Sequence, residues 1–427
     1  MIPPLIGGLQ KTTSHSVVLP FYIYASLGFL AGTTLLLFST DALGASYFSP
    51  KMLAITHTMA LAWGTMIIFG ASHQLLPVLV ESKLNSELLA YLTFVFAAVG
   101  IPFLIYGFYV FDLGWPVLVG ALLINIAVCC YLGNVLGSFL RGNTKNVHAW
   151  YVLTATLWLL ATTLFGLMLA VNFRLPILAR NSLEYLSVHA HLGIVGWFAL
   201  TVVGVGARLI PLFMISKYTN DRTLWLIFVL LNSALAGFTM LALARTSPLL
   251  FYIPILLGLA AVLLFGRYCY MAYLVRIRKR LDAQVKTALI SVVQLSLPLA
   301  VLIPAIALLP PGRFSGMAQL YGFCIFFGWL TAIILGMTFK TMPFIVWNKV
   351  YHNQAHKGKT PAPRELFSDR IYRLMMYCYL GGFAAFVPGI VLLNQVLLKT
   401  GAAALLITAA LQVYNVLLTA GHKSKQA

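Results

Sequence analysis

Long apolar runs separated by short polar stretches dominate the pattern of this chain. Each run reaches about 20 residues or more, the length that an α-helix needs to cross the hydrocarbon core of a bilayer. The runs do not alternate apolar and polar positions, as the strands of a membrane β-barrel do. The pattern predicts about twelve transmembrane helices, near residues 18–39, 51–80, 85–110, 114–140, 148–172, 184–216, 221–244, 247–277, 285–310, 315–348, 370–397 and 399–420.

The composition agrees with a chain that lies mostly in lipid. Of 427 residues, 61% are hydrophobic and 9% are charged, whereas a soluble domain carries roughly 25% charged residues. We therefore predict an all-α polytopic membrane protein with a single transmembrane domain over residues 1–427. The first residues, Met1 to Pro4, lack a basic segment and a cleavage site, so no removable signal peptide is expected.

The basic residues predict how the chain is oriented. Of 28 Lys and Arg residues, 19 fall in the two tails and the even-numbered loops, and six fall in the odd-numbered loops. This bias places both termini in the cytoplasm, here beneath a bacterial inner membrane. The net charge of +19 thus reflects orientation-setting loops and does not indicate a nucleic-acid partner. Membrane lipid is the expected partner, and the stretch from Arg276 to Lys286 suits contact with anionic lipid.

Trp, Gly and Pro recur at equal spacing in the second, sixth and tenth predicted helices. The copies are offset by 134 and 132 residues, and each offset contains four predicted helices. We therefore predict three four-helix repeats, roughly 18–140, 148–277 and 285–420. The Gly permits close helix approach, and the Pro is expected to kink or stop each helix. The three sets are Trp63, Gly70 and Pro77; Trp197, Gly204 and Pro211; and Trp329, Gly336 and Pro343.

Two histidines occupy one column of this repeat. His57 and His191 stand six residues before the repeated Trp, and Phe323 takes that place in the third copy. The three helices run in the same direction, so both imidazoles are expected at one depth in the outer half of the membrane. His189 lies about 200° around the helix from His191, so the two are able to serve different sites but not to chelate one metal. Imidazole binds haem iron and copper, although hydrogen bonding to a neighbour is the alternative.

The acidic residues set a limit on function. All nine fall in predicted loops or at helix ends, and no carboxylate lies at mid-membrane, where ion-coupled transporters and proton pumps generally place one. Proton pumping is therefore not expected. Glu184 and Tyr185 precede His189 by one turn, where they either hydrogen-bond a ligand imidazole or act as interfacial anchors. Gln74, Arg208 and Lys340 share a column just before the repeated Pro.

Twelve helices in three four-helix arcs, with histidines high on the second helix of an arc, resemble subunit I of the haem–copper oxidases. The segments His57–Pro77 and His189–Pro211 look most like divergent single-subunit relatives of the cbb3-type branch, and the NnrS family of membrane haemoproteins is of similar kind. The resemblance implies that His57 ligates a low-spin haem b, with His191 or His189 as the second ligand. The remaining imidazole would hold a second haem or a copper.

The sequence also departs from that superfamily. Neither histidine of helix six is followed four residues later by the expected Tyr, and helix seven (221–244) contains no His. Phe323 stands where the tenth helix should carry His-x-His. An ordinary oxygen-reducing centre with its full copper site is therefore not expected.

Three hypotheses follow from these residues. The first is a haem-binding redox protein that transfers electrons or reacts with nitric oxide or oxygen, an oxidoreductase without proton pumping whose partner is an electron-donor protein or a quinol. The second is a transporter or channel whose histidines line a path for a metal, haem or a small solute, although threefold repetition is unusual for such carriers. The third is a non-catalytic accessory subunit that keeps the oxidase scaffold.

Overall fold

The fold is helical throughout the described part of the chain. The computed structural model describes residues 13–44, 46–308, 314–352 and 360–424, so the residues at the amino terminus that bear on a signal peptide lie outside them. Within these ranges the one β-type pairing is an isolated bridge between Ser216 and Arg276. The longer α-helices are α2 (His15–Leu37), α3 (Pro50–His57), α4 (Met66–Val80), α5 (Glu87–Tyr109), α6 (Trp115–Arg141), α7 (Val147–Asn172), α8 (Leu186–His191), α9 (Leu200–Phe213), α10 (Asp221–Ala244), α11 (Tyr252–Leu274), α12 (Ala283–Gln294), α13 (Leu297–Leu308), α14 (Phe314–Phe323), α15 (Thr331–Tyr351), α16 (Asp369–Leu392) and α17 (Gln395–Ala420).

Twelve helical spans in the described ranges are long and apolar enough to cross a membrane, which confirms the predicted fold class. The eleventh differs most clearly from its predicted end, because α16 stops at Leu392. Leu393 takes a left-handed conformation with φ 50°, and the Asn394 side chain then accepts hydrogen bonds from the N–H groups of Val396 and Leu397 at 3.0 and 3.1 Å. A left-handed residue and an Asn cap therefore separate the last two helices.

The ninth span is interrupted, although the sequence pattern predicts one continuous helix. It consists of α12 and α13, with a turn at residues 295–296 between them. Pro298 lies at the start of α13. Proline has no N–H to donate to the preceding turn, and its ring clashes with that turn's carbonyl, so the α-helical ladder breaks there.

The helices form two compact units, which we describe separately. The middle unit comprises Thr13 and Ser72–Leu281, and the flanking unit comprises the described residues of Ser14–Ala71 and Asp282–Ala427. The boundary falls inside α4. The middle unit contains predicted helices three to eight, so the two units do not coincide with the three sequence repeats, which stay a prediction.

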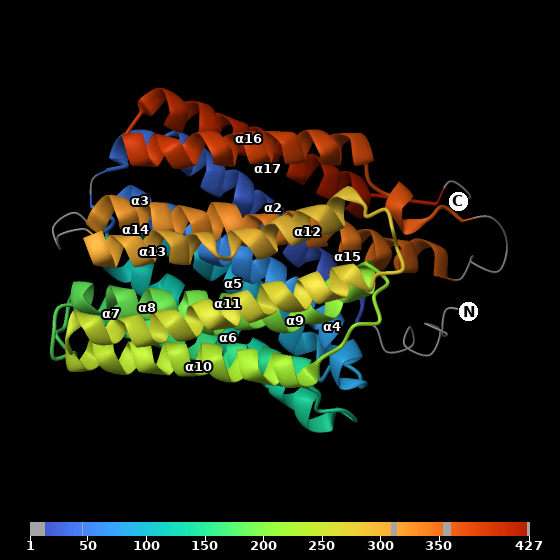
Figure 1. Cartoon of the computed structure of the whole chain (residues 1–427), viewed down its shortest axis with the longest axis horizontal. Coiled ribbons are helices and arrows are strands. Elements are labelled where there is room, and N and C mark those ends of the chain that lie inside the picture. Colours follow the sequence, from blue (N-terminus) through green and yellow to red (C-terminus); the bar gives the residue numbers. More distant parts are fainter. Residues whose placement is uncertain (1–12, 45, 309–313, 353–359, 425–427) are drawn as a thin grey trace. The chain divides into compact units, whose positions relative to one another are not determined.

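In the middle unit, neighbouring helices pack as antiparallel pairs. Figure 1 shows α10 and α11 lying alongside each other. The pair α5 and α6 is held at close range by two glycines: a Cβ atom at Gly120 would lie 2.5 Å from the Leu104 amide nitrogen, and one at Gly100 would lie 2.8 Å from the Leu123 Cβ. Small residues at such crossings let helix backbones approach in a membrane.

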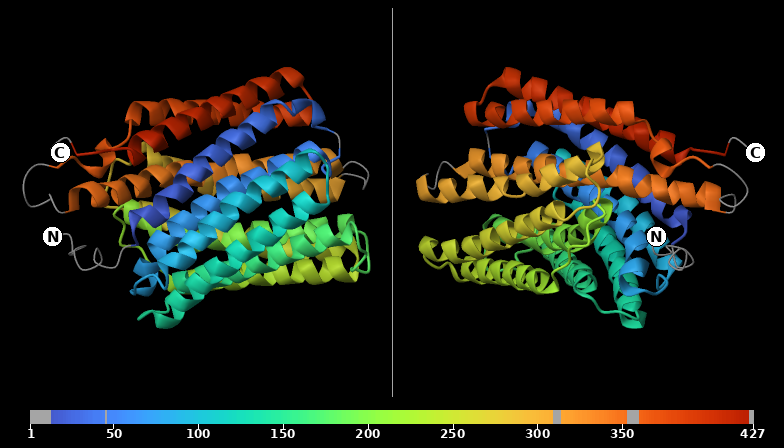
Figure 2. Two further views of the ribbon diagram at one scale, coloured as in Figure 1. Left: turned by 180° about the vertical axis from the view of Figure 1, so that it is seen from behind. Right: turned by 45° about the vertical axis from the view of Figure 1, so that its right-hand side comes forward.

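In the flanking unit, α16 and α17 form the corresponding pair, which stays together in both views of Figure 2. A Cβ atom at Gly401 would lie 2.9 Å from the Gly382 carbonyl oxygen, so these helices also cross at paired glycines. α17 packs in turn on α2, and α12 packs on α15. Within the flanking unit, α2 therefore packs on two of the last four spans, through α17 and α15.

Candidate functional site

Helices two, six and ten share an unusual backbone feature that the sequence did not predict. Each contains a π-helical segment: η2 (Thr58–Thr65), η4 (Leu192–Ala199) and η7 (Cys324–Leu330). The segments begin at the repeat offsets, directly after His57, His191 and Phe323. π-Helix is rare and is found frequently at functional sites. Its recurrence in one column gives this position a distinctive structure in all three helices.

Threonine hydroxyl groups hydrogen-bond to some of the backbone carbonyls in the π-helical segments. The side chain of Thr65 donates to the carbonyl of Ala60 at 2.9 Å, and that of Thr331 donates to the carbonyl of Phe326 at 2.7 Å. In both cases the acceptor lies five residues earlier, which is the π-helical spacing. The sixth helix has Ala199 at this position, so its segment forms without the hydroxyl.

The repeated tryptophans are buried anchors of these segments. Trp63, Trp197 and Trp329 are among the largest fully buried side chains described. Trp63 stacks on Phe29 at a centroid distance of 4.7 Å, and its Nε1 donates to the Thr331 hydroxyl at 3.1 Å. This bond joins helices two and ten inside the flanking unit.

The predicted close approach at the repeated glycine is present in each copy. A Cβ atom at Gly70 would lie 2.7 Å from the Cβ of Phe21, and one at Gly204 would lie 2.3 Å from the Cβ of Tyr151. At Gly336 it would lie 2.8 Å from the Gln284 carbonyl oxygen. Each partner belongs to the helix that opens the same predicted repeat, so the second helix of each repeat packs on its first.

The repeated proline is predicted to kink or stop each helix, and a helix end follows it closely in two of the three copies. α4 ends three residues after Pro77 and α9 ends two residues after Pro211. The tenth helix instead continues past Pro343 to Tyr351. The proline at this position therefore does not by itself end the helix.

His57 and His191 have the same local hydrogen bond. The Nδ1 of His57 lies 2.8 Å from the Leu53 carbonyl oxygen, and the Nδ1 of His191 lies 2.7 Å from the Ser187 carbonyl oxygen. Each carbonyl belongs to the residue four positions earlier. A carbonyl only accepts, so Nδ1 carries the proton and Nε2 carries the lone pair. Metal-ligating histidines are commonly held in this way, because the carbonyl fixes the tautomer and raises the basicity of the ligand nitrogen.

His189 and His191 contact different neighbours, as their spacing predicts. The ring of His189 lies against Gly166 of α7, where an added Cβ atom would come within 2.8 Å of Cε1. The ring of His191 lies against Phe238 of α10, with centroids 4.4 Å apart. The two imidazoles of the His-x-His sequence therefore have separate surroundings within the middle unit.

The candidate ligands are divided between the units. His57 belongs to the flanking unit, whereas His189 and His191 belong to the middle unit, and each is half-buried. Among the residues that the structure describes, no three His, Cys, Asp or Glu side chains group together to hold a metal ion. The donor set found here therefore consists of single imidazoles. Single imidazoles suit the axial positions of a haem, where the porphyrin supplies the other four nitrogens.

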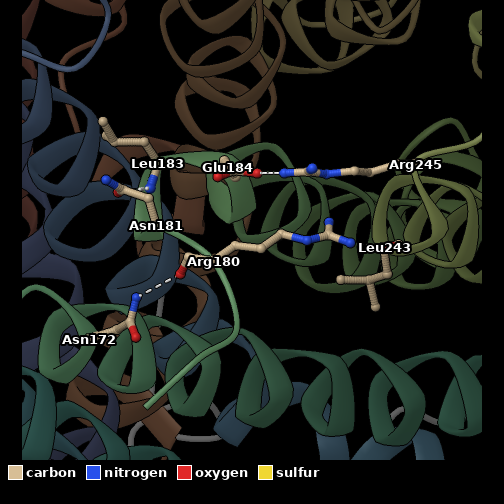
Figure 3. A network of polar contacts seen from close by, with 7 residues as sticks. All are labelled: Asn172, Arg180, Asn181, Leu183, Glu184, Leu243 and Arg245. Atoms are coloured by element: carbon tan, nitrogen blue, oxygen red, sulfur yellow. Dashed lines mark hydrogen bonds and ion pairs between the residues drawn. The ribbon is translucent and has the colours of Figure 1, made fainter. Parts of the chain in front are cut away.

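The polar residues ahead of helix six form a network with the end of α10. Glu184 pairs with Arg245, and Figure 3 shows these side chains meeting end to end. Arg180 reaches the Leu243 carbonyl, with Nη2 2.8 Å from the oxygen, and its guanidinium lies over the ring of Tyr185. Glu184 and Tyr185 thus tie the start of helix six to the end of α10. The two predicted roles of Glu184 and Tyr185, as interfacial anchors or as hydrogen-bond partners of a ligand imidazole, stay predictions.

Acidic residues lie at helix ends or between helices, as predicted. Asp282 precedes the first residue of α12 and pairs with Lys340 of α15. Lys340 shares the column just before the repeated Pro with Gln74 and Arg208. Of these residues, Arg208 is exposed. One member of this column is therefore neutralised by an ion pair inside the flanking unit.

Phe323 in the third copy has a different environment from the histidines. Its ring is nearly parallel to those of Phe327, Phe383 and Phe386, with centroids 5.1, 5.5 and 4.3 Å away. It is 5% exposed. The third column position is therefore filled by packed phenyl rings.

Two further histidines of the middle unit are buried. The Nδ1 of His148 lies 2.8 Å from the carbonyl oxygen of Gly204, the repeated glycine. His73 is almost fully buried, with its ring edge-on to Tyr131 at 5.4 Å. The spacing of 56 residues between His148 and Gly204 carries no local signal, so only the fold reveals that contact.

The comparisons with known proteins add no relative. No model of a known protein family matches the sequence, and no curated protein is significantly similar to it. The functional argument therefore depends on the fold and on the local structure of the histidines.

Proposed function

We propose that this chain is a haem-binding redox protein of the membrane, similar in kind to subunit I of the haem–copper oxidases. The observation that carries the proposal is the matched setting of His57 and His191. Both precede a π-helical segment, both stand six residues before a buried Trp, and both direct Nδ1 to the carbonyl four residues earlier. Two residues with one local structure are suited to the same chemical task.

In this proposal, His57 and His191 would each hold a haem b through Nε2. The carbonyls of Leu53 and Ser187 hold the Nδ1 protons, so both imidazoles stay in the binding tautomer and keep their orientation. When bound, the haem supplies an iron that changes oxidation state. Imidazole ligation would suit the haem to electron transfer rather than to binding of nitric oxide or oxygen.

His189 is the residue available for a second group. Its ring has its own surroundings beside Gly166, so a second haem or a copper would be held apart from the first pair. Copper sites generally take several imidazole or sulfur ligands, and the described residues contain no group of three His, Cys, Asp or Glu side chains that could hold a metal ion. The residues therefore fit a haem better than a copper centre, and gas chemistry would require this second site.

The proposed setting is the inner membrane of a bacterium, with both termini in the cytoplasm and an electron-donor protein or a quinol as redox partner. The distribution of Lys and Arg among the loops supports this orientation. Reporter domains fused after Ala427 and within residues 175–181 test it. A cytoplasm-active reporter should function at the first site and a periplasm-active reporter at the second; the opposite result would invert the topology.

The decisive experiment is the absorption spectrum of the purified protein, oxidised and dithionite-reduced, with a pyridine haemochrome assay. The wild type should show a Soret band and sharp reduced α and β bands. His57→Ala and His191→Ala should each lose the low-spin spectrum. His148→Ala is the matched control, because its Nδ1 also bonds to a carbonyl but it lies outside the repeat column. A protein that stays colourless after haem supplementation would overturn the proposal.

A transport function is the second candidate, and one feature of the flanking unit favours it. α12 buries a stripe of polar side chains in the membrane: Gln284, Thr287, Ser291 and Gln294. Tyr372 and Tyr379 of α16 hydrogen-bond to Thr287 and Gln294 at 3.0 and 3.3 Å. Buried polar residues in a membrane often mark a solute path. Uptake of metal ions by proteoliposomes of a haem-free protein would favour this function over the redox proposal.

A further inference from the structure

Two loops of the middle unit are joined by backbone hydrogen bonds where helices six and eight end. The N–H of Ile277 donates to the Ile215 carbonyl at 3.1 Å, and the N–H of Arg278 donates to the Met214 carbonyl at 3.4 Å. Ser216 and Arg276 form the isolated antiparallel bridge between them. Residues 214–217 and 275–280 therefore form one structure, which we call the paired loop.

The paired loop gathers positive charge at one end of the middle unit. Two acidic residues, Asp221 and Asp282, lie in the surrounding sequence, and Asp282 is paired with Lys340. Lys217, Lys279 and Arg280 are exposed. The six basic residues in and next to the paired loop are Lys217, Arg222, Arg276, Arg278, Lys279 and Arg280.

Apolar side chains project from the same loop. Ile215 and Ile277, which the backbone hydrogen bond places side by side, are 55% and 60% exposed. Ile215 has φ 52°, a left-handed conformation that is strained for a β-branched residue. The fold thus maintains a strained backbone at a position where a large apolar side chain is exposed. A loop surrounded only by water would gain nothing from this arrangement.

An aromatic contact fixes one of the cations. The guanidinium of Arg276 lies 3.6 Å from the centre of the Tyr273 ring, and its Nη1 donates to the Tyr273 carbonyl at 2.6 Å. Tyrosine is enriched at the boundary between membrane and water. The paired loop therefore combines an interfacial aromatic residue, exposed isoleucines and a basic cluster directly after two membrane spans.

We propose that the paired loop binds anionic phospholipid headgroups of the leaflet that it faces. The basic side chains pair with the phosphates, and Ile215 and Ile277 enter the boundary between headgroups and acyl chains. A cluster of four to eight basic residues next to a membrane span is characteristic of such binding, and buried apolar area adds to the electrostatic attraction. The inference does not depend on haem binding, so the two proposals succeed or fail separately.

The test measures lipids retained by the full-length protein. The protein is delipidated in detergent, mixed with equal amounts of phosphatidylglycerol and phosphatidylcholine, and analysed by native mass spectrometry. The wild type should retain phosphatidylglycerol preferentially. The triple variant Arg278→Gln, Lys279→Gln, Arg280→Gln should lower that preference by roughly ten-fold or more, because each basic residue near an anionic surface contributes an interaction worth about five-fold in binding.

Two further variants make the result specific. The control Lys83→Gln, Arg141→Gln, Lys145→Gln removes the same charge from other loops of the middle unit and should keep the preference. Ile215→Ser with Ile277→Ser should weaken retention of both lipids while keeping the charge. Equal losses in the two triple variants would mean that only net charge matters, and displacement of the lipid by millimolar inorganic phosphate would identify a free-anion site. Either outcome overturns the assignment.

Discussion

One column of the repeat holds a histidine in helices two and six and a phenylalanine in helix ten. The backbone at the three positions is the same, but the chemistry differs. All three positions precede a π-helical segment, a buried Trp and a glycine crossing. His57 and His191 are half-buried, whereas Phe323 is packed among three other phenyl rings. The π-helical segment therefore belongs to the scaffold, and the residue before it determines whether the position offers a ligand or fills a core.

This difference predicts opposite effects of substitution, and the largest concerns packing. Phe323→Ala removes a ring with a neighbour 4.3 Å away and should lower the free energy of unfolding by about 3–5 kcal/mol. Its haem content per folded protein should not change. His191→Ala should abolish the low-spin spectrum with a much smaller loss of stability.

Thermal unfolding in detergent and a haemochrome assay measure the two properties on the same samples. The comparison would be broken if Phe323→Ala lost haem as completely as His191→Ala. It would equally be broken if His191→Ala were as unstable as Phe323→Ala, because His191 would then be a packing residue.

The second prediction tests the part that the three columns share. At Gly204 a Cβ atom would lie 2.3 Å from the Cβ of Tyr151, an atom next to the backbone that has little freedom to move. Gly204→Ala should therefore destabilise the chain by about 1–3 kcal/mol through overpacking. The control is Gly206→Ala, where the nearest atom, Phe265 Cζ, is 3.5 Å away.

Gly206→Ala should be neutral or slightly stabilising, because alanine favours the helix more than glycine does. Thermal midpoints of the two variants, measured side by side, check the prediction. Equal midpoints would show that helix six does not depend on close contact with α7.

The third prediction compares how much the hydroxyl groups of Thr331 and Thr65 contribute to the stability of the π-helical segments. Thr331→Val removes the acceptor of the Trp63 indole as well as the bond to the Phe326 carbonyl, so it should cost about 1 kcal/mol. Thr65→Val removes the bond to the Ala60 carbonyl and should cost about 0.6 kcal/mol, the average for such bonds in membranes. Chemical unfolding curves resolve this order, and the reverse order would show that the Trp63 bond contributes nothing.

Much of the architecture could be predicted from sequence, because lipid imposes a simple rule on composition. The apolar runs gave the twelve spans, and the acidic residues lie at helix ends as expected. The repeated glycines also indicated where helices meet. These features depend on residue type and spacing within one segment, which a single sequence displays directly.

The rest required the fold, because it depends on contacts between distant segments. No composition distinguishes the π-helical segment of Leu192–Ala199 from α-helix. The pairing of Glu184 with Arg245 joins residues 61 positions apart. The carbonyl partners of His57 and His191 lie within one turn, yet the sequence does not show which ring nitrogen faces them. The haem ligands themselves stay a prediction that spectroscopy tests.

The smallest expected effect concerns the starts of the two histidine helices, where each has an ion pair. Lys51 at the start of α3 contacts Asp41 at 3.1 Å, and Glu184 pairs with Arg245 before α8. The hydrogen bond from Lys51 lowers the pKa of Asp41 below its ordinary value. A carboxyl whose pKa is lowered in the folded state adds stability above its unfolded pKa and loses it as the pH falls through the folded value.

Any stabilisation from this pair should therefore be complete at neutral pH and disappear only in acid, below the ordinary pKa of an aspartate. Because Asp41 is fully exposed, solvent screens the pair, and Lys51→Gln should leave the thermal midpoint at pH 7 unchanged. The same variant should raise the pKa of Asp41 toward its ordinary value, which NMR titration of the carboxyl would measure. A clear drop in the midpoint at neutral pH would show that this pair, unlike an ordinary surface ion pair, helps to hold the helix that carries His57.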